Sequence, residues 1–395
     1  MKFKIIIFLL LCLIATGCKS EDSDKNENSI KNEISPQNKT TLNMTFTGDL
    51  LFEAPLYHSL NDYDLTEYLS EVKPLLSGDL VMGNLEVPLG GENLGISGEG
   101  YSFNGPQKLL PQLQSAGFNF LTTANNHSYD RGLDGVKNTI DCLNEYQMDF
   151  AGSNNSASDQ DSIKVVRKKD VNIAILSYTY GTNQLVDQNH LYSVNCFLDQ
   201  QLTFSKSKQE MLKEDVSKAK QLADIVIVAM HWGNEFTNDL SRTQQTVGKF
   251  LNDLEVDVII GNHSHNIQPI EYLYNENNYE TLVIYSLGNF ISGDVKVSRA
   301  SEYFKNLYQL GAILNFDLSY EHILKTKEIN NIKVTPIINH YDANYQNFKL
   351  KLLKNYNDDM FKTHGRSSYC HTFNLEMVNQ QLDLVSGDFI NIDRS

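Results

Sequence analysis

The sequence predicts an α/β protein in which two packed, mixed β-sheets are flanked by helices. From residue 42 onward, short apolar runs alternate with segments whose apolar residues recur at helical spacing. Two of the runs, residues 225–230 and 256–260, are apolar throughout, which is typical of strands buried on both faces. After residue 268 strands follow one another without long helices between them, and this favours a second sheet packed on the first.

The first half of the folded region is expected to contain four strands and two helices. We predict strands at residues 44–47, 80–83, 118–123 and 171–178, each a short apolar run. Residues 106–116 are predicted as a helix because leucines recur at helical spacing after Pro106, a residue favoured at the start of a helix. The apolar stripe from Leu133 to Leu143 predicts the second helix.

The second half continues this alternation and then changes to strands. Helices are expected around residues 211–222 and 247–254, each followed by one of the two apolar strands named above. Further strands are predicted at residues 270–274, 282–285, 312–316 and 332–338. We therefore expect one domain over residues 44–340, followed at 341–395 by a C-terminal extension, which we expect to be helical.

The N-terminus has the pattern of a bacterial lipoprotein signal peptide. Lys2 and Lys4 precede an apolar run at residues 5–16, which is shorter than the roughly 20 residues that a membrane-spanning helix needs. The run ends in Ala-Thr-Gly before Cys18, so residues 1–17 are expected to be removed and Cys18 to carry lipid. A lipid there would hold the chain at the extracellular face of a bacterial membrane. Ordinary secretion with an incidental cysteine is the alternative.

The segment at residues 18–43 and the overall charge lead to two further expectations. This N-terminal segment is rich in Ser, Asp, Glu, Asn and Lys, so we expect a disordered tether. The whole chain of 395 residues has 33 basic and 49 acidic side chains, a net charge of −16. An acidic chain is a poor match for phosphate backbones, so nucleic acid is excluded as the main partner.

Polar residues of the kinds that bind metals follow the apolar strands, where the carboxyl ends of strands meet ligands in α/β sheets. The clusters are Phe46-Thr47-Gly48-Asp49, Asn84-Leu85-Glu86, Asn125-Asn126-His127, His231-Trp232-Gly233, Gly261-Asn262-His263-Ser264-His265 and Tyr285-Ser286-Leu287-Gly288-Asn289-Phe290. We expect His263 and His265, two residues apart on an extended segment, to point to the same side. Imidazoles together with carboxylate and amide oxygens suit zinc, manganese or iron better than calcium.

As an ordered set, these six motifs resemble the CapA family of capsule and poly-γ-glutamate biosynthesis proteins, which have the calcineurin-like metallophosphoesterase fold. The resemblance covers roughly residues 42–293. It implies one or two divalent transition-metal ions and a site that works by metal-assisted hydrolysis.

The resemblance also implies a role for each residue. Asp49 and His265 would bind the first metal, Glu86 or Asn84 would bridge, and Asn126, His231 and His263 would hold the second metal. His127 would be the acid that protonates a leaving oxygen. Other residues are expected to orient the metal ligands and His127 without binding the metal themselves: Asn84, Asn125, Asp130, Glu235 and Asn289.

Two departures from the phosphoesterase pattern, both shared by the CapA family, limit these implied roles. Phosphoesterases have Asp-x-His in the first motif, where this chain has Asp49-Leu50-Leu51, and Gly-Asp in the second, where it has Asn84-Leu85-Glu86. A site that binds a single metal ion is therefore an alternative to a site with two. Purely structural roles also remain open: helix caps for Asp49 and Glu86, a turn for Asn126, a core imidazole for His231 and a hydrogen-bond donor for His127.

Three functions follow as expectations. The leading one is a lipid-anchored protein that synthesises, exports or trims an anionic surface polymer such as poly-γ-glutamate, in a possible complex with a membrane synthase. The second is a non-enzymatic subunit that binds the polymer for such a synthase. The third is an extracellular metallophosphatase acting on a phosphoester.

Overall fold

The computed structural model describes residues 38–294, 300–368, 370, 372–385, 387 and 389–394. The expected signal peptide, Cys18 and the tether up to residue 37 lie outside the described residues. The chain divides into two compact units, Met1–Lys39 and Thr40–Ser395, and the fold described below is that of the second.

The larger of two sheets has nine strands, seven of them in the order β14-β13-β12-β1-β2-β3-β4. In addition β11 pairs with β1 and β15 pairs with β13. The bounds are β1 (Lys39–Leu50), β2 (Leu80–Leu85), β3 (Phe120–Thr122), β4 (Asp149–Ala151), β11 (Asn289–Ile291), β12 (Leu310–Glu321), β13 (Thr326–His340), β14 (Lys349–Leu352) and β15 (Asn391–Ile392). Strands β1 to β4 run parallel, whereas β12, β13 and β14 run antiparallel.

The smaller sheet has six strands in the order β5-β6-β7-β8-β10-β9. Its strands are β5 (Lys164–Lys168), β6 (Val171–Thr179), β7 (Ile225–His231), β8 (Val258–Asn262), β9 (Ile270–Tyr274) and β10 (Glu280–Ile284). The four central strands β6, β7, β8 and β10 are parallel, and the two edge strands are antiparallel to their neighbours.

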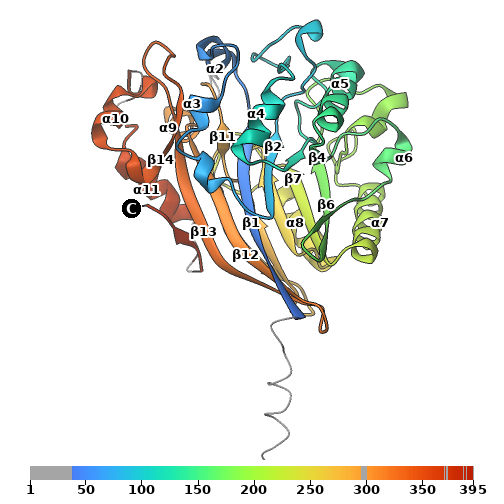
Figure 1. The fold of residues 1–395 in the computed structure, drawn as a ribbon. Coiled ribbons are helices and arrows are strands. Elements are labelled where there is room, and N and C mark those ends of the chain that lie inside the picture. Colours follow the sequence, from blue (N-terminus) through green and yellow to red (C-terminus); the bar gives the residue numbers. More distant parts are fainter. Residues whose placement is uncertain are drawn as a thin grey trace, which may run out of the picture. The chain divides into compact units, whose positions relative to one another are not determined.

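The two sheets pack face to face, and helices cover their outer faces (Figure 1). One buried cluster contains Phe46 and Leu314 of the larger sheet together with Ile227 and Val258 of the smaller. The helices are α2 (Ala54–Ser59), α3 (Thr66–Leu69), α4 (Leu109–Ala116), α5 (Gly132–Glu145), α6 (Ala157–Gln160), α7 (Lys206–Leu222), α8 (Arg242–Asp253), α9 (Glu302–Leu307), α10 (Asp358–Thr363) and α11 (Leu375–Val385). Helices α4 and α5 pack on the larger sheet, and α7 and α8 pack on the smaller one. The predicted fold class, two packed mixed sheets with helices outside, is confirmed.

Two features differ in detail from the sequence-based expectation. Strand β1 begins at Lys39, whereas we expected the tether to continue to residue 43. The segment from residue 341 onward belongs to the same compact unit and contributes two strands, β14 and β15, besides the expected helices. Among the described residues, no helix combines the length and apolar character needed to cross a membrane.

Candidate metal centre

The carboxyl ends of strands from both sheets meet at one buried cluster of potential metal ligands. Three overlapping groups of side chains have ligand atoms within 4.8 Å of one another: Glu86, His231 and His263; Glu235, His263 and His265; and Asp49, Glu86 and His265. Five of these six side chains are buried, and Glu235 is half-buried. Sequence reasoning placed Glu235 behind the ligands, but its carboxylate lies among the histidines.

Asp49 lies at the end of β1 and is held by two donors. Asn84 Nδ2 donates to Asp49 Oδ1 at 2.7 Å, and the backbone N–H of His263 donates to Oδ2 at 3.2 Å. The parallel register aligns Asp49 with Asn84 of β2, so adjacent strands position both residues. Leu51, which occupies the place of the phosphoesterase histidine, is buried in the core. The first motif therefore supplies one ligand side chain and not two.

Glu86 follows β2 and is fully buried without a hydrogen bond to either carboxylate oxygen from any residue that the structure describes. His231 Nε2 lies 3.3 Å from Glu86 Oε1, and His265 Nε2 lies 4.0 Å from the same oxygen. Burying a carboxylate without donors is costly, so this side chain indicates that a cation belongs beside it.

His263 and His265 reach the cluster by a route that the sequence did not predict. Strand β8 ends at Asn262, and both histidines have left-handed backbone angles, with φ of 99° and 56°. The expectation that they project from an extended segment is therefore wrong, although both side chains do lie at the site. Their ring centroids are 6.1 Å apart.

The hydrogen bonds of His265 determine which ring nitrogen faces the cluster. Asn289 Nδ2 donates to the carbonyl of Tyr308 at 3.0 Å, so its Oδ1 is the atom that accepts from His265 Nδ1 at 2.9 Å. With the proton on Nδ1, the lone pair of Nε2 points toward Glu86. The gap of 4.0 Å to Glu86 Oε1 is too long for a hydrogen bond, so this nitrogen is one that could bind a metal ion.

Asn126 and His231 meet on the other side of Glu86. The Oδ1 atom of Asn126 lies 2.7 Å from His231 Nε2, and Asn84 Nδ2 lies 3.3 Å from His231 Nδ1. Asn126, His231 and Glu86 thus converge, as the resemblance implied. Asn125 lies further back, where its Nδ2 donates to the carbonyl of Leu85 at 2.8 Å.

His127 stands beside the cluster and pairs with Asp130. The distance from His127 Nδ1 to Asp130 Oδ2 is 2.7 Å, and the same oxygen accepts from the backbone N–H of Phe103 at 2.8 Å. The Phe103 ring packs against the imidazole at a centroid distance of 4.4 Å. Because Nδ1 of His127 donates its proton in a hydrogen bond to Asp130, Nε2 is the ring nitrogen that can exchange a proton with a bound molecule.

Sequence reasoning missed Asn183, which lies just after β6. Its backbone N–H donates to the carbonyl of Asn126 at 2.8 Å, and its Nδ2 lies 3.3 Å from His127 Nδ1. It therefore holds a potential ligand in place, and its side chain lies beside the potential acid. The strand-end rule that found the other residues could have found this one, since it follows the predicted strand at 171–178.

Burial and the neighbouring charges shift the pKa values of the side chains in the cluster. Burial raises the pKa of Asp49, but hydrogen bonding to His265 and the nearby charge of His231 outweigh it, and the net direction is downward. Burial and the neighbouring Asp49 hold the pKa of Glu86 well above its usual range. Burial lowers the pKa of His231 to about 3 and that of His263 well below its usual value. Uncharged imidazoles beside two crowded carboxylates are the donor set that a divalent transition metal fits.

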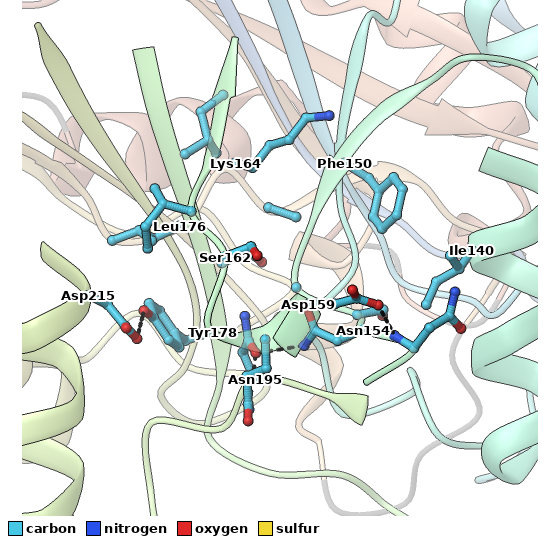
Figure 2. Close-up of a pocket in the computed structure, with 18 of the residues that line it drawn as sticks. Ile140, Phe150, Asn154, Asp159, Ser162, Lys164, Leu176, Tyr178, Asn195 and Asp215 are labelled. Carbon is cyan, nitrogen blue, oxygen red and sulfur yellow. Dashed lines mark hydrogen bonds between the residues drawn. The ribbon is translucent and has the colours of Figure 1, made fainter. Parts of the chain in front are cut away.

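A separate pocket of about 380 Å³ opens between β4 and the strands β5 and β6 (Figure 2). Its polar side chains pair mainly with one another. Asn154 donates to Asn195 Oδ1 at 2.9 Å, and the hydroxyl of Tyr178 donates to Asp215 at 2.8 Å. None of the potential metal ligands lines this pocket, so the chemistry of the cluster does not extend into it.

The architecture and the cluster define a two-sheet α/β protein with a buried site that could hold a metal ion. The chain belongs to the bacterial capsule synthesis protein family PGA_cap, whose model matches residues 43–294. That range contains Asp49, Glu86, Asn126, His127 and all three histidines of the cluster.

Two curated relatives carry matching names. The chain is 29% identical over 262 residues to the capsule biosynthesis protein CapA of Bacillus anthracis, covering 63% of this chain and 59% of the relative. It is 29% identical over 255 residues to the PGA biosynthesis protein CapA of Bacillus subtilis (strain 168), with 63% of each covered. The matches thus span about three fifths of each relative's length.

Among solved structures, one titled as a novel phosphatase from Mycoplasma pneumoniae has a TM-score of 0.44 at 16% identity. The comparison covers 76% of this chain and 94% of that one.

Proposed function

We propose that this chain is a lipid-anchored extracellular protein that helps to synthesise, export or trim a capsule-type polymer such as poly-γ-glutamate, through a metal-dependent hydrolase-like site. The names of the two relatives support the polymer, and the residue pattern at Cys18 supports the anchor. The observation that carries the metal-dependent site is Glu86, a buried carboxylate with no hydrogen bond, facing His231 and His265.

The metal would be manganese, zinc or iron, as one or two ions held by Asp49, Glu86, Asn126, His231, His263 and His265. When bound, it would supply a nucleophilic water and positive charge for a reacting phosphoester or amide. Glu235 lies close enough to be a further ligand.

The remaining residues orient the site and handle protons. Asp130 accepts from Nδ1 of His127 and fixes the ring, so Nε2 is the nitrogen from which a leaving group would receive a proton. Asn183 holds the backbone of Asn126 beside that imidazole. Phe103 covers one side of the ring and excludes water there. A membrane synthase is the proposed partner, and the anionic polymer is the proposed substrate.

A second candidate is a non-enzymatic subunit that binds the polymer for the synthase. The observation in its favour is Leu51, which is buried where phosphoesterases place a metal-binding histidine. In that case the metal would serve as a binding point for carboxylates of the polymer rather than as a source of nucleophilic water.

The test compares full-length variants in cells that make the polymer, with surface glutamate measured after acid hydrolysis. His127→Ala leaves every proposed ligand in place, so we expect it to retain metal and to abolish polymer processing. The exposed His58→Ala is the matched control and should behave as wild type. Full polymer output from His127→Ala would favour the non-enzymatic binding subunit over the hydrolase. Full output from a strain that lacks this protein would contradict both candidate functions.

A further inference from the structure

One end of the fold, opposite the metal centre, carries exposed apolar residues among basic ones. It is formed by the turn between β12 and β13, residues 322–325, and the turn between β5 and β6, residues 169–170. We call these residues, with Arg167 and Lys168, the hairpin tip. In Figure 1 the β12–β13 hairpin ends beside the start of β1.

Specific contacts fix the hairpin tip to the beginning of β1. The hydroxyl of Thr40 donates to Asp170 Oδ1 at 2.6 Å and lies 3.0 Å from His322 Nε2, which in turn lies 3.2 Å from Asp170 Oδ2. Lys169 Nζ donates to the carbonyl of Thr41 at 2.6 Å. The two turns and β1 therefore form one surface.

Two large apolar side chains project from this surface. Ile323 is 68% exposed and Leu324 is 63% exposed. These two side chains are not buried in the core, because they lie in the turn beyond Glu321 and Thr326, the last residue pair of the β12–β13 ladder. Burial in an apolar phase would stabilise them.

Basic residues surround this apolar pair, although the chain as a whole has a net charge of −16. Arg167, Lys169 and Lys325 are exposed, and Lys168 is half-buried. Arg167, Lys168 and Lys325 form no ion pair with any residue that the structure describes. The anions at this end include Asp170, the exposed Glu328, Asp79, which pairs with Lys169 at 2.9 Å, and Glu321, whose carboxylate accepts from the backbone N–H of Leu324.

We propose that the hairpin tip docks on an anionic lipid surface, with Ile323 and Leu324 inserted among the acyl chains and the basic residues at the headgroups. Apolar side chains ringed by Lys and Arg are the composition that binds such surfaces without spanning them. The position in the chain also favours lipid, because β1 starts at this surface and the residues before it include the apolar run 5–16 and Cys18. This inference goes beyond the proposed function and does not depend on the metal.

Docking would orient the metal centre. Strand β1 runs from the hairpin tip at Thr40 to Asp49, and at about 3.3 Å per residue the two ends lie about 30 Å apart. The metal centre would therefore face away from the membrane, toward a polymer outside it.

The experiment uses the full chain in phosphatidylglycerol–phosphatidylcholine vesicles that contain brominated lipid. Leu324→Trp places a quenchable indole at the hairpin tip, and the single native tryptophan, Trp232, is fully buried and gives a constant background. Leu185→Trp is the control, since Leu185 is 98% exposed in the loop that follows β6, away from the hairpin tip. We expect at least roughly twofold stronger quenching for Leu324→Trp than for Leu185→Trp.

The charge requirement is tested on the Leu324→Trp background. Lys168→Gln with Lys325→Gln should weaken the quenching, whereas Lys137→Gln with Lys213→Gln, on helices α5 and α7, should not. Equal quenching at positions 324 and 185, or quenching unchanged in purely zwitterionic vesicles, would overturn the proposal. Quenching that depends on protein density at fixed lipid composition would also overturn it, because it would indicate contact between copies of the chain.

Discussion

At the residue scale, the candidate metal centre contains a buried side chain that is unfavourable for stability in the absence of a ligand. Glu86 is buried beside Asp49, and no residue that the structure describes donates a hydrogen bond to it. An unpaired buried carboxylate costs several kcal/mol relative to a paired one. A bound cation would offset this cost. Glu86 is therefore a stronger indication of a cation site than any of the histidines.

The first prediction concerns Glu86→Gln. In metal-free protein the change replaces a buried carboxyl, whose pKa is held well above its usual range, by a neutral amide of similar size, so we expect the free energy of unfolding to rise or stay level, by on the order of 1 kcal/mol. In the presence of manganese or zinc the order should reverse, because the variant loses a ligand and the stabilisation that binding supplies. Thermal unfolding with and without chelator measures both. A variant less stable than wild type under both conditions would contradict the role of Glu86 as a ligand.

The sequence predicted most of the cluster residue by residue, since the ligands follow apolar strands that are easily recognised. It did not predict the details that depend on the folded chain. Glu235, in the loop after β7, lies among the histidines, and the backbone of His263 and His265 is left-handed. Neither fact has a local signal of the kind that periodicity provides.

At the scale of elements, the site depends on close approach between strands of the larger sheet. A Cβ atom at Gly48 would lie 1.9 Å from the carbonyl oxygen of Gly288, next to the hydrogen bond that joins Asp49 N–H to the same carbonyl. The glycine is therefore needed for β1 to pair with β11. That pairing places Asp49 level with Asn289.

The second prediction follows from this approach. Gly48→Ala should lower the free energy of unfolding by about 2 kcal/mol or more, because backbone atoms and not a flexible side chain block the new methyl group. Gly181→Ala is the control, since its nearest neighbour is 3.5 Å away on the side chain of Leu202, and we expect a change within about 0.5 kcal/mol. Denaturant titration measures both. Equal stability of the two variants would show that the strands can separate at Gly48.

The accuracy of the predicted bounds does not follow element length, since β12 and β13, with 12 and 15 residues, were predicted only at residues 312–316 and 332–338. Strand β9 was predicted at its observed bounds, and helix α7 was found from its stripe although it begins five residues earlier, at Lys206. Strands β4 and β11 have three residues each, too few for a period to be recognised, and they form because neighbouring strands pair with them.

At the scale of the whole unit, the C-terminal segment is attached through buried polar groups. His364 Nε2 lies 2.9 Å from the carbonyl of Asn339 on β13, and the backbone N–H of Arg366 donates to its Nδ1 at 2.9 Å. The first nitrogen must therefore carry the proton and the second must not. Only the neutral imidazole satisfies both contacts.

The third prediction is acid sensitivity from His364. Burial, together with the charges of His340 and Arg366, lowers its pKa to about 3, although the bond to Asn339 acts in the opposite direction. Between the unfolded pKa of about 6.5 and this value only the unfolded chain takes up the proton, so stability falls as the pH falls. At pH 5 this loss is on the order of 2 kcal/mol.

His364→Gln should reduce the loss of stability between pH 7 and pH 5, and the exposed His58→Gln should leave it unchanged. Denaturant titrations at the two pH values measure the difference, and histidines of the metal centre contribute equally to all three proteins. An unchanged loss in His364→Gln would contradict the tautomer assigned here.

The central claim is that the strand ends of the two sheets form a metal centre, and metal content tests it most directly. Full-length protein loaded with manganese, zinc or iron and freed of excess metal should retain one or two ions per chain by mass spectrometry. His263→Ala with His265→Ala should lose them, whereas His58→Ala with His190→Ala, outside the cluster, should keep them. Wild-type protein that retains no transition metal, with the double His263 and His265 variant unchanged in stability, would contradict the account.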